Sequence, residues 1–465
     1  MSITPRRNPG CGWPLRLFFC SLLFLRVSIG FAEDPEPLRL SFRECLTRAE
    51  GHPVLSSALR EAEAALARLD WGRSLGRPAL TVISLGGLVP DASGDALQTT
   101  TPTPDRSGQF SHLGEYIRFE ILLEQPLFTF GKLDAGIRAL DERAAAAQSE
   151  EAWVRRRFHE VIRQLYDGRL YVDELRRLLS ELDGLLKEAG ERLEQALAEE
   201  SGAVTAVDRM KFQVVEAGLR QQALEVERKA RDLNNGMCRV LALPEGTDWA
   251  PKETRLRAEP VPTDLLDRLR RADLAAHPQL TAARHAVAAR RSETVFRQRQ
   301  RYPDVFFAAR GRYARAPGRE EQESPFAYDT FNLFDAGVAL GIRGSWGWGR
   351  ENAIIRESAA LAEAAAEKAL ALEQKLEQEV AEALHGYEAA LAALPFAEDQ
   401  YRAARAWSLS ASNGFKLGLL PAQDLIQALK AYAEARLNRI ETLRRQREAS
   451  AKLVRNAGFD WPETP

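Results

Sequence analysis

The stretch Gln125-Pro-Leu-Phe-Thr-Phe-Gly131-Lys132 decides the fold of this chain. Before it, apolar and polar residues alternate as in a β-strand, and after it apolar residues recur at helical spacing. The same transition occurs 218 residues later, in Gly344-Ser-Trp-Gly-Trp-Gly349-Arg350. We interpret the two stretches as copies of one strand-to-helix junction. Pro126, Gly131 and Gly349 would have structural roles there, because a sharp bend favours residues with special backbone conformations.

Three further landmarks repeat in the same order. His52-Pro53 recurs as His277-Pro278 and Pro78 recurs as Pro303, both at an offset of 225 residues. Gly202-x5-Asp208 recurs as Gly418-x5-Asp424 at an offset of 216 residues. Ordered landmarks with a slowly drifting offset indicate duplication of one large unit. We therefore divide the chain into a first repeat, residues 33–250, and a second repeat, residues 251–465.

Each repeat is predicted to contain two strands and long helices that resemble coiled coils. The first repeat has strands at about 79–89 and 115–125 and helices at about 42–76, 132–199 and 204–241. The second has strands at about 304–314 and 333–343 and helices at about 265–300, 351–415 and 420–456. Leu175, Leu178 and Leu182 show the coiled-coil spacing. The predicted class is mainly α with a β contribution.

Tyr116 to Gln125 alternates between apolar and polar residues, with Leu122 as the exception, and both strand segments of the second repeat show the same pattern. All four strand segments are about ten residues long, which is the length of a tilted membrane-crossing strand. The alternative is a soluble sandwich, whose strands alternate too. On the membrane interpretation, the polar side chains face the lumen of a transmembrane β-barrel. These predicted lumen residues are Arg118, Glu120, Arg310, Arg312, Asp335 and Arg343.

Four strands are too few to close such a barrel, because the smallest transmembrane barrels have eight. Bare sheet edges in lipid would leave backbone groups without hydrogen bonds. Several chains must therefore pool their strands. Two copies would give eight strands and a filled lumen, whereas three would give twelve strands and room for a pore.

The first 32 residues read as a secretory signal peptide. Arg6 and Arg7 form a basic region, Leu15 to Ile29 supply a largely apolar region in which Arg26 is an exception, and Gly30-Phe31-Ala32 offers a cleavage site. An uncleaved anchor and lipid attachment at Cys20 are the alternatives. Removal of residues 1–32 would take away four arginines and no acid, which changes the net charge from −2 to −6. This charge does not suggest a nucleic-acid partner.

Catalytic chemistry has little support in the sequence. We find no Cys-x-x-Cys, no His-Glu-x-x-His and no phosphate-binding glycine loop, so we expect no enzyme activity, cofactor or metal site. Cys45 and Cys238 remain after the signal peptide. They are interpreted as two buried thiols or, alternatively, as a disulfide.

The chain resembles the TolC-like outer-membrane efflux proteins, or outer membrane factors, over nearly all of its mature length. Gln125 to Lys132 is similar to the strand-to-helix motif of that family. Lys416-Leu-Gly418-Leu-Leu-Pro-Ala-Gln-Asp424 is similar to its helix-turn-helix at the periplasmic tip, and Glu200-Ser-Gly202 to Asp208 is a weaker copy. Gly202 and Gly418 would have structural roles in these turns.

The resemblance implies a homotrimer with a 12-stranded β-barrel in the outer membrane and a 12-helix α-barrel in the periplasm. It also implies an exit duct of a tripartite efflux or type I secretion system. The partners would be a periplasmic adaptor (membrane fusion protein), an inner-membrane pump or ABC exporter, and outer-membrane lipid. The runner-up is a periplasmic coiled-coil adaptor or scaffold without a transmembrane barrel.

The resemblance places a gate at the periplasmic entrance, at Asp424, Asp208, Phe415 and Gln427. Relatives often have a second acid one turn after the first, where this chain has Gln427, and some have a hydroxyl where it has Phe415. A ring of Asp424 carboxylates would favour cations. The alternative for both aspartates is helix capping. Phe128, Phe130, Trp346 and Trp348 would form an aromatic girdle at the membrane boundary.

Overall fold

The computed structural model describes residues 37–90, 113–198, 205–244, 246–271, 274–319, 321, 329–347 and 349–459. The predicted signal peptide, Gly202 and Trp348 lie outside these described residues. In chain order the elements of the first repeat are β1 Leu38–Leu40, α1 Phe42–Ala49, α2 Pro53–Ser74, β2 Ala79–Pro90, β3 Leu113–Phe128, α3 Lys132–Ala198 and α4 Ala206–Val240. Those that follow are β4 Trp249–Pro251, α5 Thr263–Arg270, α6 Pro278–Arg299, β5 Asp304–Arg315, β6 Leu333–Arg343, α7 Arg350–Lys416 and α8 Ala422–Asn456.

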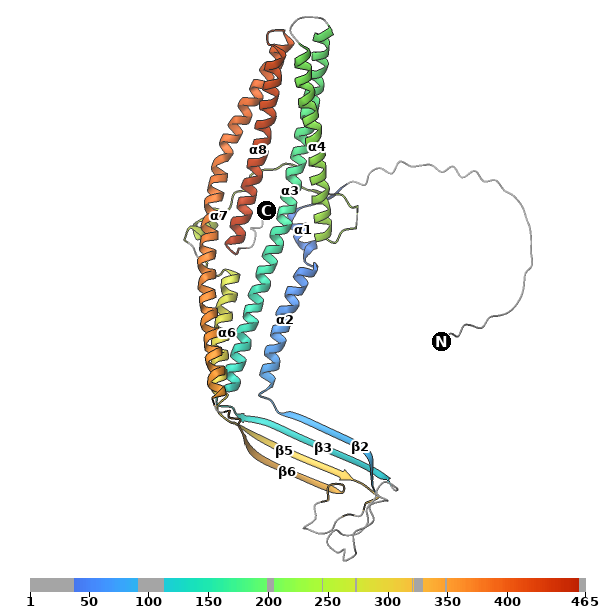
Figure 1. Ribbon diagram of the computed structural model, residues 1–465, viewed down its shortest axis with the longest axis vertical. Coiled ribbons are helices and arrows are strands. Elements are labelled where there is room, and N and C mark those ends of the chain that lie inside the picture. Colours follow the sequence, from blue (N-terminus) through green and yellow to red (C-terminus); the bar gives the residue numbers. More distant parts are fainter. Residues whose placement is uncertain are drawn as a thin grey trace, which may run out of the picture.

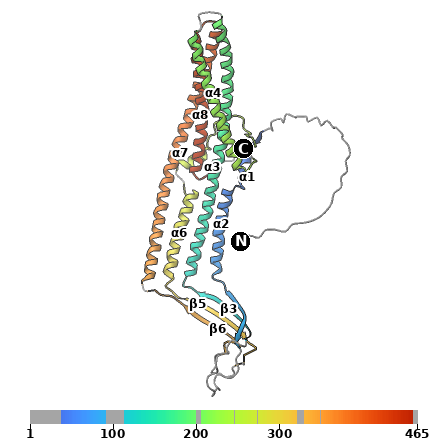
Figure 2. The same cartoon turned by 45° about the vertical axis from the view of Figure 1, so that its right-hand side comes forward.

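Two very long helices, α3 and α7, set the shape of the molecule (Figure 1). Each has 67 residues and is therefore roughly 100 Å long. Two shorter helices pack along each one: α2 and α4 along α3, and α6 and α8 along α7. Helix α3 also contacts α6 and α8, which joins the two repeats. Figure 2 shows the same rods above the strands after a 45° turn.

The prediction of one continuous helix at 42–76 and another at 265–300 is wrong. In the structure each range holds two helices, and the second of each pair begins at a proline. The first is split into α1 and α2, and the second into α5 and α6. His52 and His277 precede Pro53 and Pro278 and have extended backbones, with ψ of 138° and 125°. A residue before proline avoids the helical region, whereas proline itself fits the first helical position.

The four long strands form one antiparallel sheet in the order β2-β3-β5-β6. Strand β3 pairs with β2 from Ala79↔Glu124 to Pro90↔Leu113, and it joins the two repeats through β5. A register shift between Pro126 and Phe128 marks the end of β3. Within the described strands, β2 and β6 each pair on one side only, so the sheet has two open edges.

A smaller parallel pair, β1 with β4, packs near the middle of the helical part. Trp249 of β4 is fully buried and its ring lies 6.1 Å from that of Tyr166 in α3. The surrounding core contains Cys45, Met237 and Cys238. None of the described helices combines the length and the apolar character that a helix needs to cross a membrane.

Candidate channel surfaces

One face of the sheet carries all six predicted lumen residues. Glu120, Arg312 and Asp335 are direct register partners across β3, β5 and β6, so their side chains share this face. Arg118, Arg310 and Arg343 follow at even spacing along the same strands, so they lie on that face as well. We call this surface the charged face.

The charges on this face pair with one another. The Arg118 guanidinium lies 2.5 Å from Glu120, and Arg312 Nε donates to Asp335 at 3.0 Å. Arg310 lies 3.9 Å from Asp335, and Arg343 lies 3.6 Å from Glu124 of the neighbouring repeat. The face is therefore strongly polar without being dominated by one sign of charge.

The site prediction missed three charged residues of the same surface. Glu124 and Asp304 share the strand parity of the predicted set, and Lys132 lies 2.5 Å from Asp304 at the junction. Every second residue of a strand lies on the same face, so counting in steps of two along the strands from Glu120 and Arg310 leads to Glu124 and Asp304. Lys132 lies beyond the strand in α3, where counting along strands gives no signal.

The opposite face of the sheet is apolar and exposed, and we call it the apolar face. Register places Val82, Ile121, Phe119, Tyr313 and Phe334 on it. Phe334 is 81% exposed and Val338, Leu340 and Ile342 are each at least 73% exposed. Within one chain nothing described covers this face. Its members are Leu80, Val82, Ile117, Phe119, Ile121, Tyr313, Phe334, Val338, Leu340 and Ile342.

Glycine is required at both strand-to-helix junctions. Gly131 has φ +71° and Gly349 has φ +84°, a region that side chains disfavour. At Gly131 a Cβ would also lie 1.7 Å from Nη1 of Arg299, whereas at Gly349 nothing lies within 4 Å. Pro126 stands where the β3 register shifts, next to the exposed Phe128.

The α7–α8 turn forms one half of the helical tip. Gly418 has φ +69°, and the N–H groups of Gly418 and Leu419 bond back to the carbonyls of Phe415 and Gly414. Phe415 packs toward Ala189 and Leu425, which fixes the hairpin against α3. The turn itself exposes Leu417 (72%) and Leu419 (74%).

The two predicted gate aspartates differ in their contacts. Asp208 is part of a capping box: Thr205 N donates to its carboxylate at 3.1 Å, and Lys211 lies 3.3 Å away. The hydrogen bond that the Thr205 hydroxyl donates to this carboxylate at 2.7 Å holds the Asp208 pKa below its usual range. Asp424 is in the first turn of α8, and its carboxylate has no side-chain hydrogen bond or ion pair with the described residues.

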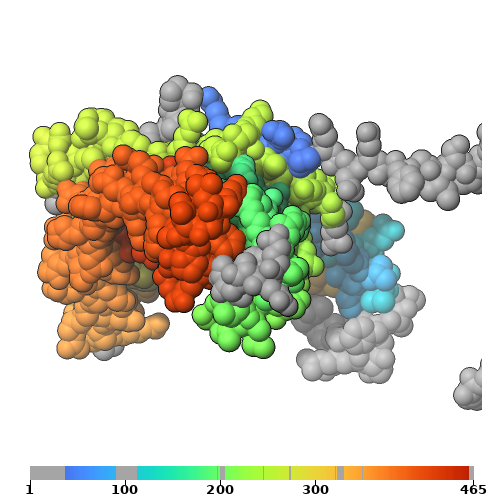
Figure 3. Space-filling view, turned by 90° about the horizontal axis from the view of Figure 1, so that it is seen from above, coloured from blue at the N-terminus to red at the C-terminus, as the bar shows by residue number. Residues whose placement is uncertain are grey.

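Gln427 is exposed one turn beyond Asp424. In Figure 3, seen from above, the α7–α8 end in orange to red lies beside the α3–α4 end in green. Asp424 is therefore available for a role other than capping, whereas Asp208 already has a capping role.

A buried charge cluster that the sequence did not predict lies in the middle of the helical part. Asp167 of α3 lies 2.8 Å from Arg163 and 2.6 Å from Arg447 of α8. Glu259 pairs with both arginines, at 3.2 Å from Arg447. We call Arg163, Asp167, Glu259 and Arg447 the central charge cluster. It holds the segment between β4 and α5 against α3 and α8.

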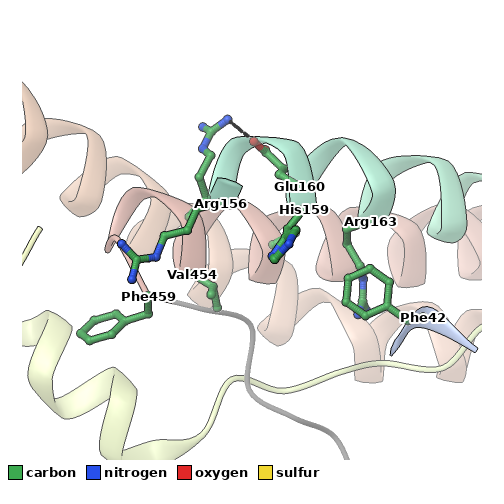
Figure 4. A pocket seen from close by; sticks show the side chains of 9 residues that line it. Phe42, Arg156, His159, Glu160, Arg163, Val454 and Phe459 are labelled. Atoms are coloured by element: carbon green, nitrogen blue, oxygen red, sulfur yellow. Dashed lines mark hydrogen bonds and ion pairs between the residues drawn. The ribbon is translucent and has the colours of Figure 1, made fainter. Parts of the chain in front are cut away.

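A small hollow beside this cluster offers too little room for a ligand. Figure 4 shows it between Phe42, His159, Arg163 and Phe459, and its volume is about 30 Å³. Such a volume accommodates little more than a water molecule. Glu160 at its edge is paired with Arg455 at 2.8 Å.

The two cysteines of the described residues are free and buried. Burial raises the pKa of the Cys45 thiol to about 12, and burial also raises that of Cys238. Cys238 Sγ donates to the carbonyl of Thr247 at 3.3 Å. These thiols therefore act as apolar core groups. Among the described residues no cluster of three or more His, Cys, Asp or Glu could hold a metal ion.

No protein-family model matches the chain, and no curated protein matches it in sequence. Solved structures do match its fold. The outer membrane protein VceC from Vibrio cholerae is similar with a TM-score of 0.72 and 18% identity, over 90% of this chain and 96% of VceC.

Two further structures give the same result. The CmeC outer membrane channel of Campylobacter jejuni has a TM-score of 0.68 and 14% identity, over 91% of this chain and 87% of CmeC. The open MtrE outer membrane channel of Neisseria gonorrhoeae has a TM-score of 0.66 and 16% identity, over 90% of this chain and 89% of MtrE. The chain therefore has the fold of the TolC-like outer-membrane channels.

Proposed function

We propose that the protein is a trimeric outer-membrane channel that extends into the periplasm. The observation that carries this proposal is the sheet, which has a charged face, an exposed apolar face and two open edges at one end of helices roughly 100 Å long. An apolar patch of this size on a single chain indicates an interaction surface. Lipid is the surrounding that suits a face of Phe334, Leu340 and Ile342.

The open edges explain why three chains are needed. In lipid, the unpaired N–H and C=O groups of β2 and β6 would each cost several kcal/mol. Pairing β6 of one chain with β2 of the next removes these edges. Three chains would contribute twelve strands, which enclose a pore, and the long helices would continue the tube as a 12-helix α-barrel.

The charged face would then line the pore. Because Arg118, Arg312 and Arg343 are paired with carboxylates, the lining would be wet and would lack a strong field of one sign. Such a lumen would pass polar solutes without a steep preference for anions or cations. Selection would therefore occur at the other end of the tube.

The tip would provide the gate and the docking point. Three copies of Asp424 around the entrance would attract cations and repel one another. The exposed Leu417 and Leu419 give the tip an apolar surface for a protein partner. We assign this partner as a periplasmic adaptor that connects the duct to an inner-membrane pump or ABC exporter, which would supply the energy for transport.

Fractionation and gel mobility test the channel directly. The full chain should be found in the outer-membrane fraction and run as a trimer band that becomes a monomer band only after heating. In planar bilayers, the same trimer should conduct. A protein found in the soluble periplasmic fraction with no heat-modifiable band would contradict the proposal and favour a coiled-coil scaffold.

A further inference from the structure

The apolar face ends in an aromatic cluster at the strand-to-helix junction. Phe128, Val305 and Ile342 are register partners, so Phe128 lies at the junction end of this face. The Phe128 and Phe130 rings are 4.7 Å apart, and Phe130 stacks on Tyr302 at 5.5 Å. All three rings are exposed. Exposed Tyr and Phe at the end of a lipid-facing surface are typical of the membrane–water interface.

Arg299 adjoins this cluster. Its Nη1 donates to the carbonyl of Phe130 at 3.3 Å, and its guanidinium covers Gly131 so closely that a Cβ there would collide with it. No ion pair joins this guanidinium to a carboxylate of the described residues. Four of its five N–H donors therefore remain for another acceptor.

Arg301, two residues later, also has a guanidinium that donates a hydrogen bond near an exposed aromatic ring. Its guanidinium donates to the side-chain oxygen of Asn352, and its carbonyl accepts a hydrogen bond from Trp346 Nε1 at 2.9 Å. Trp346 is 67% exposed. The nearby carboxylate of Glu351 accepts a hydrogen bond from the Gly347 N–H, and it makes no ion pair with Arg301.

We propose that Arg299 and Arg301, with Tyr302 and Trp346, form a headgroup site for anionic phospholipid of the periplasmic leaflet. This inference rests on the proposed function, because the apolar face must be in lipid for the site to lie at a headgroup level. We call these four residues the basic junction. Guanidinium forks match phosphate oxygens in geometry, and the two aromatic side chains place their polar ends at the interface.

A lipid is the expected ligand because the apolar face and the basic junction form one continuous surface. Both arginines lie at the junction end of the apolar face, so a lipid whose chains cover Ile342 and Phe128 would present its phosphate to Arg299 and Arg301. A headgroup that carries a second phosphate, or an uncharged glycerol, keeps a net negative charge. This charge is attracted to two arginines that make no ion pair among the described residues. Phosphatidylcholine, whose ammonium group cancels its phosphate, should bind less well.

The test measures lipid retention by the detergent-solubilised trimer. Native mass spectrometry would compare phosphatidylglycerol with phosphatidylcholine for the wild type and for the Arg299→Gln/Arg301→Gln variant. We expect the wild type to prefer phosphatidylglycerol. The variant should lose about twenty-five-fold in affinity for phosphatidylglycerol, on the basis of a contribution of about fivefold per basic residue.

Two further variants separate the site from general effects. Arg48→Gln/Arg68→Gln removes the same charge from exposed positions on α1 and α2 and should leave the preference unchanged. Arg299→Lys/Arg301→Lys keeps the charge and should keep most of the preference. All variants should retain the heat-modifiable trimer, which shows that they have folded.

The outcomes that overturn the inference are distinct from failure of the channel itself. An intact trimer that binds both lipids equally, or a control pair that loses as much as the junction pair, overturns only the headgroup site. If inorganic phosphate at equal concentration displaces the lipid, the basic junction is a site for free phosphate and the inference of a lipid site is overturned. A chain that forms no membrane trimer at all would overturn the proposed function together with this inference.

Discussion

Gly131 and Gly349 occupy equivalent junctions, yet their surroundings differ. Both have positive φ, so a side chain at either position costs about 1 kcal/mol. Only Gly131 is also covered by a neighbouring side chain, the guanidinium of Arg299. A side chain at Gly349 would therefore meet backbone strain alone, whereas one at Gly131 would meet backbone strain and a steric clash.

We predict that Gly131→Ala lowers the dissociation temperature of the trimer more than Gly349→Ala does. The alanine at 131 must displace Arg299 from Phe130, which adds about 1 kcal/mol for the lost hydrogen bond to the cost of strain. Heating series on gels would measure both variants against the wild type. An equal decrease in dissociation temperature for both variants would show that moving the Arg299 side chain costs no stability.

Asp424 is the residue through which the tip should discriminate between ions. We predict that Asp424→Asn raises single-channel conductance or weakens block by trivalent cations, because the variant removes three like charges from one constriction. Gln423→Ala alters the same turn at an exposed, uncharged position and serves as the control. Unchanged conductance and unchanged block in the Asp424 variant would contradict a gating role.

His277 links the stability of the second repeat to pH. It is 1% exposed, and burial, with a contribution from Arg156, lowers its pKa from 6.5 to about 4. A group whose pKa is lower in the folded state gives up stability as the pH falls from 6.5 toward 4, because the unfolded chain binds the proton more readily.

We predict that opening of the region around the α6 N-terminus becomes about 2 kcal/mol easier between pH 7 and pH 5. Amide hydrogen exchange of residues 278–285, corrected for intrinsic rates, would measure this difference. Replacement of the exposed His385 by Gln should leave it unchanged. A pH-independent opening energy would mean that His277 does not titrate in this range.

Single residues also show what the sequence could and could not predict. The six lumen candidates were assigned to one face from parity within each strand, and register partners such as Glu120, Arg312 and Asp335 do share a face. Parity within a strand does not say which residues of the neighbouring strand share its face. If the pairing register shifts by one residue, every side chain of that strand moves to the opposite face of the sheet. The link between Arg343 and Glu124 across repeats was therefore beyond sequence reasoning.

At the scale of elements, the segment between β4 and α5 is held by side chains from three helices. Glu259 N donates to Gln446 of α8 at 2.9 Å, and Val261 N donates to Tyr387 of α7 at 3.0 Å. The central charge cluster adds Asp167 of α3 beneath them. These contacts join residues far apart in sequence, which is why no local pattern predicted them.

We predict that Asp167→Asn costs on the order of 3 kcal/mol, because it leaves two buried arginines short of a counter-charge. Faster amide exchange over residues 253–262 would report this loss. Glu225→Gln breaks an exposed pair with Arg228 and should cost under about 1 kcal/mol. If both variants cost the same, the cluster does not fasten the segment.

Local rules also explain where the predicted elements failed. His52-Pro53 and His277-Pro278 were used as repeat markers but not as helix boundaries, although a residue before proline avoids the helical region. Strands β1 and β4 have three residues each, too few for alternation to be visible. Their pairing depends on the burial of Trp249 against Tyr166, which is a tertiary contact.

At the scale of the whole molecule, duplication gives one chain two equivalent halves, and the proposed channel would build a larger tube from them. Each repeat supplies one strand pair and one long helix with two shorter partners, and α3 contacts α6 and α8 between the repeats. The sequence predicted this unit because its landmarks, such as Gly131 and Gly349, recur in order. The open edges at β2 and β6 call for neighbouring copies, since one chain has no further strand among its described residues to pair with them.

The mass of the purified particle tests this account most directly. Native mass spectrometry or light scattering of the full-length protein should give three chains per particle, stable only in detergent or lipid, because the apolar face needs an apolar surrounding. A monodisperse single chain that stays dissolved in plain buffer would contradict the pooled barrel.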